Sequence, residues 1–122
     1  MQSPTRIIPV VALLLVAGSA VAAENGTQFN NHCRTCHSAK ADDNRQGPSL
    51  HGIVGARAGS SQGFANYSQA MKNSGITWDE ATLEKFIANP EAVEPNNNMK
   101  PFGGVDDPAV RRQIVEFLKS QG

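Results

Sequence analysis

Two cysteines and one histidine in this chain have the types and the spacing needed to hold an iron porphyrin. Cys33, Cys36 and His37 form a C-x-x-C-H pentapeptide, which is the attachment pattern of c-type haem. Each thiol can form a thioether with a vinyl group of the porphyrin, and neutral imidazole is a common axial ligand of haem iron. The chain has only 2 cysteines, so both belong to this motif.

Three other uses of the motif remain open on these residues alone. A redox dithiol of the thioredoxin kind needs a surrounding βαβ pattern, which the sequence does not show. A structural zinc site needs four ligands, and only His32 and His51 are left to complete one. A disulfide between Cys33 and Cys36 is the third alternative use of the motif. The pentapeptide, together with an export signal at the start of the chain, favours haem.

Residues 1–23 have the pattern of a secretory signal peptide. Arg6 supplies the positive charge, residues 7–17 form an apolar run, and Ala20-Val21-Ala22 is a cleavage signal. We therefore predict cleavage near residue 23, export to the periplasm, and a single mature domain over residues 24–122 without stable membrane insertion. An uncleaved anchor is the alternative, although the apolar run is short for a membrane span.

Composition limits both the partners and the core of this domain. The chain has 11 basic and 11 acidic residues, so removing Arg6 with the signal leaves 10 against 11 and a charge near −1. There is no basic stripe, and we predict no binding of nucleic acid. About 100 residues make one domain with a thin core. A buried haem would supply much of its apolar centre.

Helical patterns recur along the mature chain, and no convincing alternating strand appears. We predict a first helix over residues 25–35, with Asn25 as its cap, and a short helix over residues 68–73. Residues 38–63 are too rich in glycine for regular structure. Glycine allows close backbone approach, so this loop can wrap tightly around a flat cofactor.

Two later helices have recognisable start signals. Thr77-Trp78-Asp79-Glu80 matches a capping box with Thr77 as the N-cap, and Asn89-Pro90 predicts the end of that helix. Asp107 can cap the last helix, because Pro108 fits its first position. The predicted fold class is all-α, with three to five short helices and long loops wrapped around one covalently bound haem.

A second axial ligand would favour electron transfer over binding of small molecules at the iron. The candidates are Met71, Met99, His32 and His51. His32 lies beside the attachment site and cannot easily reach the opposite haem face, while Met71 suits the apolar face of its predicted helix. Met99 lies in a polar loop where no helical face explains it, so we predict that it is the ligand. A thioether ligand raises the reduction potential.

The chain resembles the small class I cytochromes c, a family that includes mitochondrial cytochrome c and its soluble bacterial relatives. The resemblance spans about residues 26–119 and rests on motifs that follow one another in the family order. These motifs are Cys33-Arg34-Thr35-Cys36-His37, Gly47-Pro48-Ser49-Leu50-His51-Gly52, Gly63-Phe64, Tyr67-Ser68, Gly75-Ile76-Thr77-Trp78, Asn89-Pro90, Pro95 and Met99.

The resemblance implies how the chain would hold the haem. Cys33 and Cys36 would carry the thioether links, and His37 and Met99 would be the axial iron ligands. The Pro48 carbonyl would accept a hydrogen bond from the other ring nitrogen of His37, which fixes the orientation and tautomer of the imidazole.

Aromatic residues also receive roles from the resemblance. Tyr67 and Trp78 would donate hydrogen bonds to a haem propionate, since each combines an apolar body with one donor. Phe29 on the first helix would meet Phe117 on the last. Phe102 would cover the haem beside the axial methionine.

The chain departs from the family pattern at three places. The family arginine near a propionate is replaced by Ala56, and Arg57 follows it. Residues 96–98 are all asparagine where the family has G-T-K, and Asn97 is expected to donate toward a propionate or the haem face. The glycine of the first helix stands one place off, at Gly26.

The function implied by the resemblance is that of a monomeric one-electron carrier, not an enzyme, which meets redox proteins transiently as donor and acceptor. The alternatives are a dedicated electron-transfer subunit of a periplasmic or membrane redox enzyme, and a haem enzyme or sensor with an open iron site. The axial loop carries Glu91, Glu94 and only Lys100 in place of a lysine ring. We therefore expect docking through a small apolar patch with little positive steering.

Overall fold

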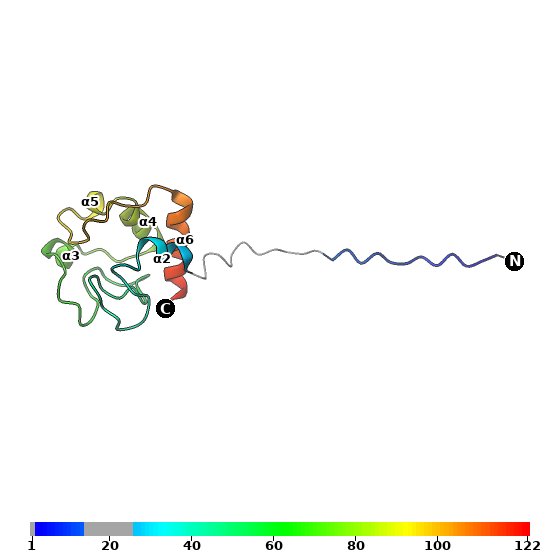
Figure 1. Ribbon diagram of the computed structural model, residues 1–122, viewed down its shortest axis with the longest axis horizontal. Coiled ribbons are helices and arrows are strands. Elements are labelled where there is room, and N and C mark those ends of the chain that lie inside the picture. Colours follow the sequence, from blue (N-terminus) through cyan, green and yellow to red (C-terminus); the bar gives the residue numbers. More distant parts are fainter. Residues whose placement is uncertain (1, 14–25) are drawn as a thin grey trace.

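Five short helices occur in the part of the chain that the computed structural model describes, residues 2–13 and 26–122. They are α2 (Thr27–His32), α3 (Gln69–Asn73), α4 (Glu80–Ala88), α5 (Pro90–Val93) and α6 (Pro108–Ser120), joined by long loops (Figure 1). Within the same residues, extended pairing is limited to an isolated antiparallel bridge between Arg57 and Thr77. The predicted all-α class is confirmed.

Helix α2 packs against α6, and this contact depends on a glycine. The rings of Phe29 and Phe117 have centroids 5.1 Å apart, as predicted. Gly26, the N-cap of α2, has a φ of 73°, and a Cβ at this position would lie 2.8 Å from the Phe117 ring. Glycine therefore provides both the left-handed conformation and the space that lets the two helices meet.

The first helix is shorter than predicted. It ends at His32 because the Cys33 carbonyl then accepts hydrogen bonds from the N–H groups of Cys36, at 3.2 Å, and His37, at 3.0 Å. These bonds bend the C-x-x-C-H segment into a separate turn. The predicted cap, Asn25, lies outside the described residues.

The predicted capping box at Thr77 is wrong, because the box begins two residues later. Asp79 is the N-cap of α4, and its carboxylate accepts the Thr82 N–H at 2.7 Å while the Thr82 hydroxyl accepts the Asp79 N–H at 2.8 Å. Thr77 instead belongs to the isolated bridge, and the Trp78 N–H donates to the Ala56 carbonyl at 2.8 Å. Pairing with a distant loop thus outweighs the local start signal.

The remaining helices begin at side-chain caps. The Ser68 hydroxyl caps α3, which lies within the predicted helix over residues 68–73. The Asp107 carboxylate caps α6 ahead of Pro108, as predicted. Helix α5 was not predicted. Asn89 ends α4 and also caps α5, since its side-chain oxygen accepts the Ala92 N–H at 3.3 Å. The chain therefore turns and re-enters a helix where a simple end was expected.

The core lies where α6 meets α2 and α4. Ile114 on α6 is completely buried. The other buried apolar residues are Phe29, Cys33, Ala58, Trp78, Leu83, Phe86, Ile87, Val105, Val115 and Leu118. Helices α4 and α6 each turn an apolar stripe inward, and their contact leaves the long loops to complete the wall of a cavity.

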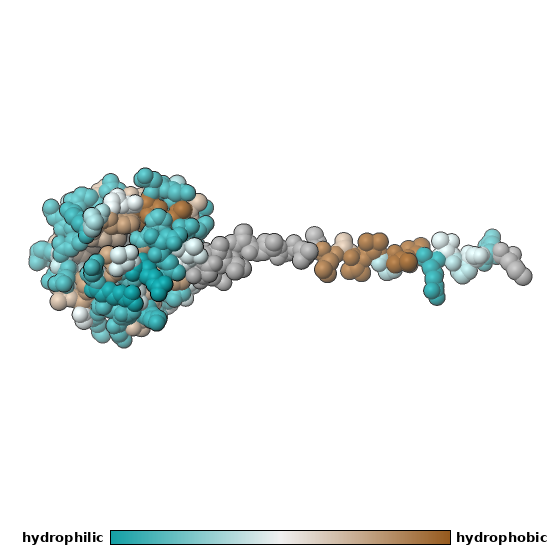
Figure 2. All heavy atoms as spheres, in the orientation of Figure 1, coloured by the Kyte–Doolittle hydropathy of each residue, from teal (hydrophilic) through white to brown (hydrophobic). Residues whose placement is uncertain are grey.

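Residues 2–13 are exposed and form no helix or strand. Figure 2 shows their apolar part as a brown stretch, made by Ile7, Ile8, Val10, Val11 and Leu13. In the described residues, no helix has the length and apolarity required to cross a bilayer. The predicted cleavage signal at residues 20–22 lies outside the described residues, so the signal peptide stays a prediction.

Candidate haem site

All seven residues predicted for the site border one cavity of about 660 Å³. Pockets that bind cofactors and small molecules have volumes of about 300–1,000 Å³, so the space suits a cofactor. The turn after α2, the loop that follows it, α3, α4, α6 and the loop after α5 all contribute to the wall. The seven residues are Cys33, Cys36, His37, Pro48, Tyr67, Trp78 and Met99.

The C-x-x-C-H turn brings both thiols to this cavity. Cys33 is buried, Cys36 is half-buried, and both are free. Burial, with a smaller effect of the neighbouring Cys36 thiol, raises the pKa of Cys33 to about 12. A redox-active dithiol has a lowered thiol pKa, so this pair is unsuited to disulfide exchange. Two free thiols on one cavity wall are suited to two thioether links.

His37 is held by one hydrogen bond to the backbone. Its Nδ1 lies 2.8 Å from the Pro48 carbonyl oxygen. A carbonyl only accepts, so Nδ1 carries the proton and Nε2 keeps its lone pair for a metal. Burial lowers the pKa of His37, although the Pro48 bond opposes this, and the neutral form is favoured. Gly47 passes so close that a Cβ there would overlap the imidazole.

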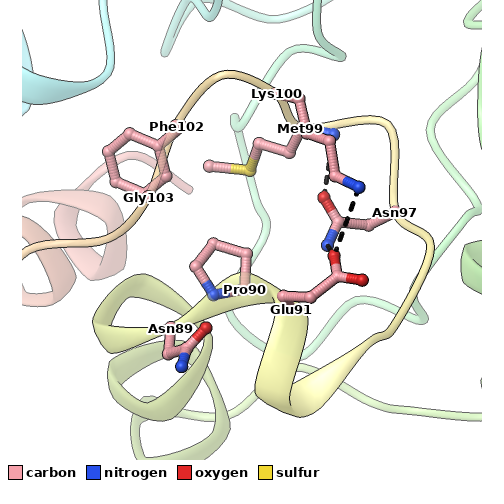
Figure 3. Close-up of a pocket in the computed structure, with 8 residues that line it drawn as sticks. All are labelled: Asn89, Pro90, Glu91, Asn97, Met99, Lys100, Phe102 and Gly103. Atoms are coloured by element: carbon pink, nitrogen blue, oxygen red, sulfur yellow. Dashed lines mark hydrogen bonds and ion pairs between the residues drawn. The ribbon is translucent and has the colours of Figure 1, made fainter.

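Met99 follows α5 in a loop and borders the same cavity. Its backbone N–H donates to Oδ1 of Asn97 at 2.8 Å. Figure 3 shows its side chain passing Pro90 and extending toward the ring of Phe102. Met71, the other methionine in the cavity wall, lies on α3. The geometry therefore brings Met99, the predicted ligand, to the cavity. Because Met71 borders the same cavity, an experiment must distinguish the two methionines.

Tyr67 and Trp78 offer donors at the cavity wall. The Tyr67 hydroxyl accepts the Ser61 N–H at 3.0 Å, which leaves its own proton available, and its ring makes an edge contact with Phe64. The Trp78 ring packs 5.1 Å from that of Phe86. Among the described residues every fully buried side-chain nitrogen or oxygen has a partner. The Trp78 indole N–H donates to none of the described residues and is therefore accessible at the cavity wall.

The structure changes the expectation for Asn97 and shows where Arg57 lies. Asn97 is only 3% exposed, and its amide nitrogen donates to the Glu94 carbonyl at 2.9 Å and to the Glu91 carboxylate at 3.2 Å. Both of its amide protons are used, so donation from Asn97 to a propionate does not fit. Arg57 borders the cavity beside Ala56, where the family arginine is missing.

Sequence reasoning missed the contacts that Gly47 and Glu91 make near the site. Gly47 lies close to the His37 ring, whereas Glu91 forms hydrogen bonds to the loop that leads to Met99. Only the glycine had a signal in the sequence, because it precedes Pro48. An exposed glutamate on a short helix gives no such signal.

These observations define a class of protein. Two free thiols, a neutral imidazole with an available Nε2, a thioether and two aromatic donors surround one large cavity in an all-α domain. Among the described residues, no group of three or more His, Cys, Asp and Glu side chains is arranged to hold a metal ion. The residues present fit a covalently attached haem.

Comparison with known proteins agrees with a site for covalently attached haem. The family model described as Cytochrome c matches residues 22–122, and the chain belongs to the cytochrome c family. The cytochrome c2 of Rhodomicrobium vannielii is 43% identical over 120 residues, which cover 95% of this chain and 94% of that protein. The cytochrome c2 of Blastochloris viridis is 37% identical over 111 residues, which cover 90% of this chain and 86% of that protein.

A solved structure shows the same fold. Cytochrome cH from Methylobacterium extorquens superposes with a TM-score of 0.72 at 39% identity, over 84% of this chain and 99% of that chain. The small class I cytochrome c fold is thereby confirmed.

Family membership establishes the general function. The protein carries one covalent c-type haem, which the C-x-x-C-H motif of Cys33 and Cys36 fits, and it is an electron carrier rather than an enzyme. Its partners are redox proteins. The haem supplies reversible one-electron chemistry at its iron, while the chain supplies attachment, orientation and burial.

Proposed function

We propose that this protein is a periplasmic one-electron carrier whose haem iron is ligated by His37 and Met99. The observation that carries the proposal is that a single cavity is bordered by both of these residues and by Cys33 and Cys36. Attachment and ligation therefore require no rearrangement of distant segments. A site that already has its ligands in place gains or loses an electron with little structural change.

The two axial residues contribute different properties. His37 offers the lone pair of Nε2, while its Nδ1–H donates to the Pro48 carbonyl at 2.8 Å and keeps the ring in one orientation. Met99 offers a soft thioether, which favours ferrous iron and raises the reduction potential. The pair suits a carrier that accepts electrons readily from a donor and passes them to a stronger acceptor.

Tyr67 and Trp78 act on the haem carboxylates. A propionate that enters the protein loses hydration and needs donors in compensation. The Tyr67 hydroxyl proton and the Trp78 indole N–H are both available at the cavity wall. Their hydrogen bonds would orient the porphyrin about the axis fixed by the two axial ligands.

The mature form is a monomer of residues 24–122 that meets its donor and acceptor transiently, after cleavage of residues 1–23 as a signal peptide. The pattern of Arg6, the apolar run and Ala20-Val21-Ala22 supports export. Haem attachment to two thiols would also prevent them from closing as a disulfide in an oxidising compartment. Mass spectrometry of the periplasmic fraction should give this polypeptide plus one haem.

Absorption spectroscopy tests the ligation. We expect haem that survives acid–acetone extraction, and a weak near-infrared sulfur–iron band in the ferric protein that is absent from Met99→Ala. Met71→Ala is the matched control, because this second methionine borders the same cavity, and it should keep the band. A band that persisted in Met99→Ala and vanished in Met71→Ala would assign the ligand to Met71.

A further inference from the structure

The segment that carries Met99, here called the methionine loop (residues 94–99), has little regular structure of its own. Asn96 in this loop has a φ of 65°, a left-handed conformation that asparagine tolerates better than most residues. A second cavity, of about 270 Å³, also borders Met99. One side of Met99 therefore faces a pocket that is open to the surface, and hydrogen bonds from neighbouring residues contribute to keeping the loop in place.

Glu91 on α5 contacts two groups of this loop and the side chain of Lys100 just after it, which Figure 3 shows in part. Its Oε1 accepts the backbone N–H of Asn96 at 2.9 Å, and its Oε2 accepts Nδ2 of Asn97 at 3.2 Å. Nζ of Lys100 lies 3.6 Å from the same Oε2. The Glu91 carboxylate thus contacts Asn96, which has the left-handed conformation, and its neighbour Asn97. It also lies near Lys100, the residue after Met99.

Asn97 passes this restraint on to Met99. Its side chain is buried, its Nδ2 donates to the Glu91 carboxylate and the Glu94 carbonyl, and its Oδ1 accepts the Met99 backbone N–H at 2.8 Å. Hydrogen bonds with an ionised partner are stronger than neutral ones. The chain of contacts runs from the Glu91 charge, through one amide, to the backbone of the axial methionine.

We propose that Glu91, acting through Asn97, is a positioning residue that keeps the Met99 thioether on the haem iron. The inference rests on the ligation by Met99 proposed above. Segments with few buried contacts open most often, so removing Glu91 should raise the fraction of protein in which Met99 has left the iron. Glu91 would then set how firmly the sixth coordination position is closed.

Titration of the ferric holoprotein with imidazole measures the fraction of protein in which Met99 has left the iron. Imidazole binds the iron only when Met99 has left, so its apparent affinity is proportional to the open population. We expect Glu91→Ala to raise the affinity by about 3- to 10-fold, the range for losing a charge-assisted bond that is partly exposed to water. Glu91→Gln keeps one acceptor oxygen and should show a smaller increase.

Two further variants make the result specific. Glu84→Ala removes a carboxylate from α4 that has no hydrogen bond or ion pair to the described residues, and it should leave the affinity unchanged. Asn97→Ala should increase the affinity, and combining it with Glu91→Ala should add little, because both act in one chain of contacts.

The outcomes distinguish failure of the proposed role of Glu91 from failure of the proposed ligation by Met99. An imidazole affinity unchanged in Glu91→Ala, with the near-infrared band present in the wild type, would overturn the role of Glu91 alone. An equal increase in Glu84→Ala would overturn it too, since the effect would then follow net charge. A wild-type protein without the band would refute ligation by Met99 and this inference with it.

Discussion

At the scale of single residues, His37 depends on its neighbours for orientation, protonation and space. The Pro48 carbonyl fixes its Nδ1–H, burial favours its neutral form, and Gly47 leaves room for its ring. A proline and a glycine that have no reactive group of their own therefore determine how this imidazole is presented to the cavity.

Gly47→Ala tests this dependence on space. The new Cβ would overlap the imidazole, so the ring must move and its bond to Pro48 must weaken. We expect the free energy of unfolding of the holoprotein, measured by denaturant titration, to fall by about 1–3 kcal/mol, as for other overpacked sites. Gly103→Ala is the control, because a Cβ there meets nothing within 4 Å. Equal stability of the two variants would contradict this account of Gly47.

At the scale of elements, α4 shows how tertiary pairing selects a helix start. Thr77 and Asp79 can both cap a helix, but Thr77 is held in an extended bridge with Arg57. Asp79 is the next competent cap, and it forms a reciprocal box with Thr82. The helix therefore begins where the chain leaves its pairing with the distant loop.

Asp79→Ala and Thr77→Ala distinguish the two possible caps. We expect Asp79→Ala to lower the free energy of unfolding by about 0.5–2 kcal/mol, the usual effect of losing an N-cap. Thr77→Ala should stay within about 0.5 kcal/mol of the wild type, as for other exposed positions. Thermal or denaturant unfolding of both holoproteins provides the measurement, and a larger loss in Thr77→Ala would restore the cap predicted from the sequence.

The effect of Asp79→Ala should also depend on pH. Hydrogen bonds from Thr82 lower the pKa of Asp79 below its ordinary value of 3.8. The unfolded chain therefore binds more protons in acid, so the cap's contribution is complete above the unfolded pKa and is lost as pH falls through the lower folded pKa. The stability difference between wild type and variant should shrink from neutral pH to about pH 3. A constant difference would show that the carboxylate charge is not involved.

At the scale of the whole molecule, the cavity has few charges around it. The charged side chains that border it are Asp42, Arg57 and Lys100, and Lys100 lies 3.6 Å from Glu91. The visible face in Figure 2 is mostly hydrophilic, with apolar areas scattered over it. Nearly balanced charge gives little electrostatic steering.

The rate of electron transfer to ferricyanide, a small anionic oxidant, should therefore depend weakly on salt. We expect the second-order rate constant to change by less than about threefold between low ionic strength and 0.15 M, where charges are screened beyond about 8 Å. The double variant Gln46→Lys with Asn98→Lys adds two cations at exposed positions in the cavity wall and should slow markedly with added salt. A wild type as salt-dependent as this variant would contradict weak steering.

The covalent attachment of haem could be predicted because the residues that carry it are local in the chain. The C-x-x-C-H turn lies within five residues, and a single hydrogen bond from His37 reaches Pro48. The cap of α6 also followed from a short pattern, whereas the contact of Phe29 with Phe117 followed from the family resemblance. The haem-attachment turn and the cap of α6 depend on neighbours in sequence, so the residues themselves indicate them.

Amino-acid order alone determined the covalent attachment of one haem, the helical class and the pattern of an exported domain. Folding decided the rest, since it depends on segments far apart in the chain. The bridge to Arg57 moved the start of α4, Asn89 opened an additional helix, and Asn97 turned its amide to Glu91 rather than to the cofactor. A polar side chain takes the partner that the completed fold brings within hydrogen-bond distance, and a linear pattern does not specify that partner.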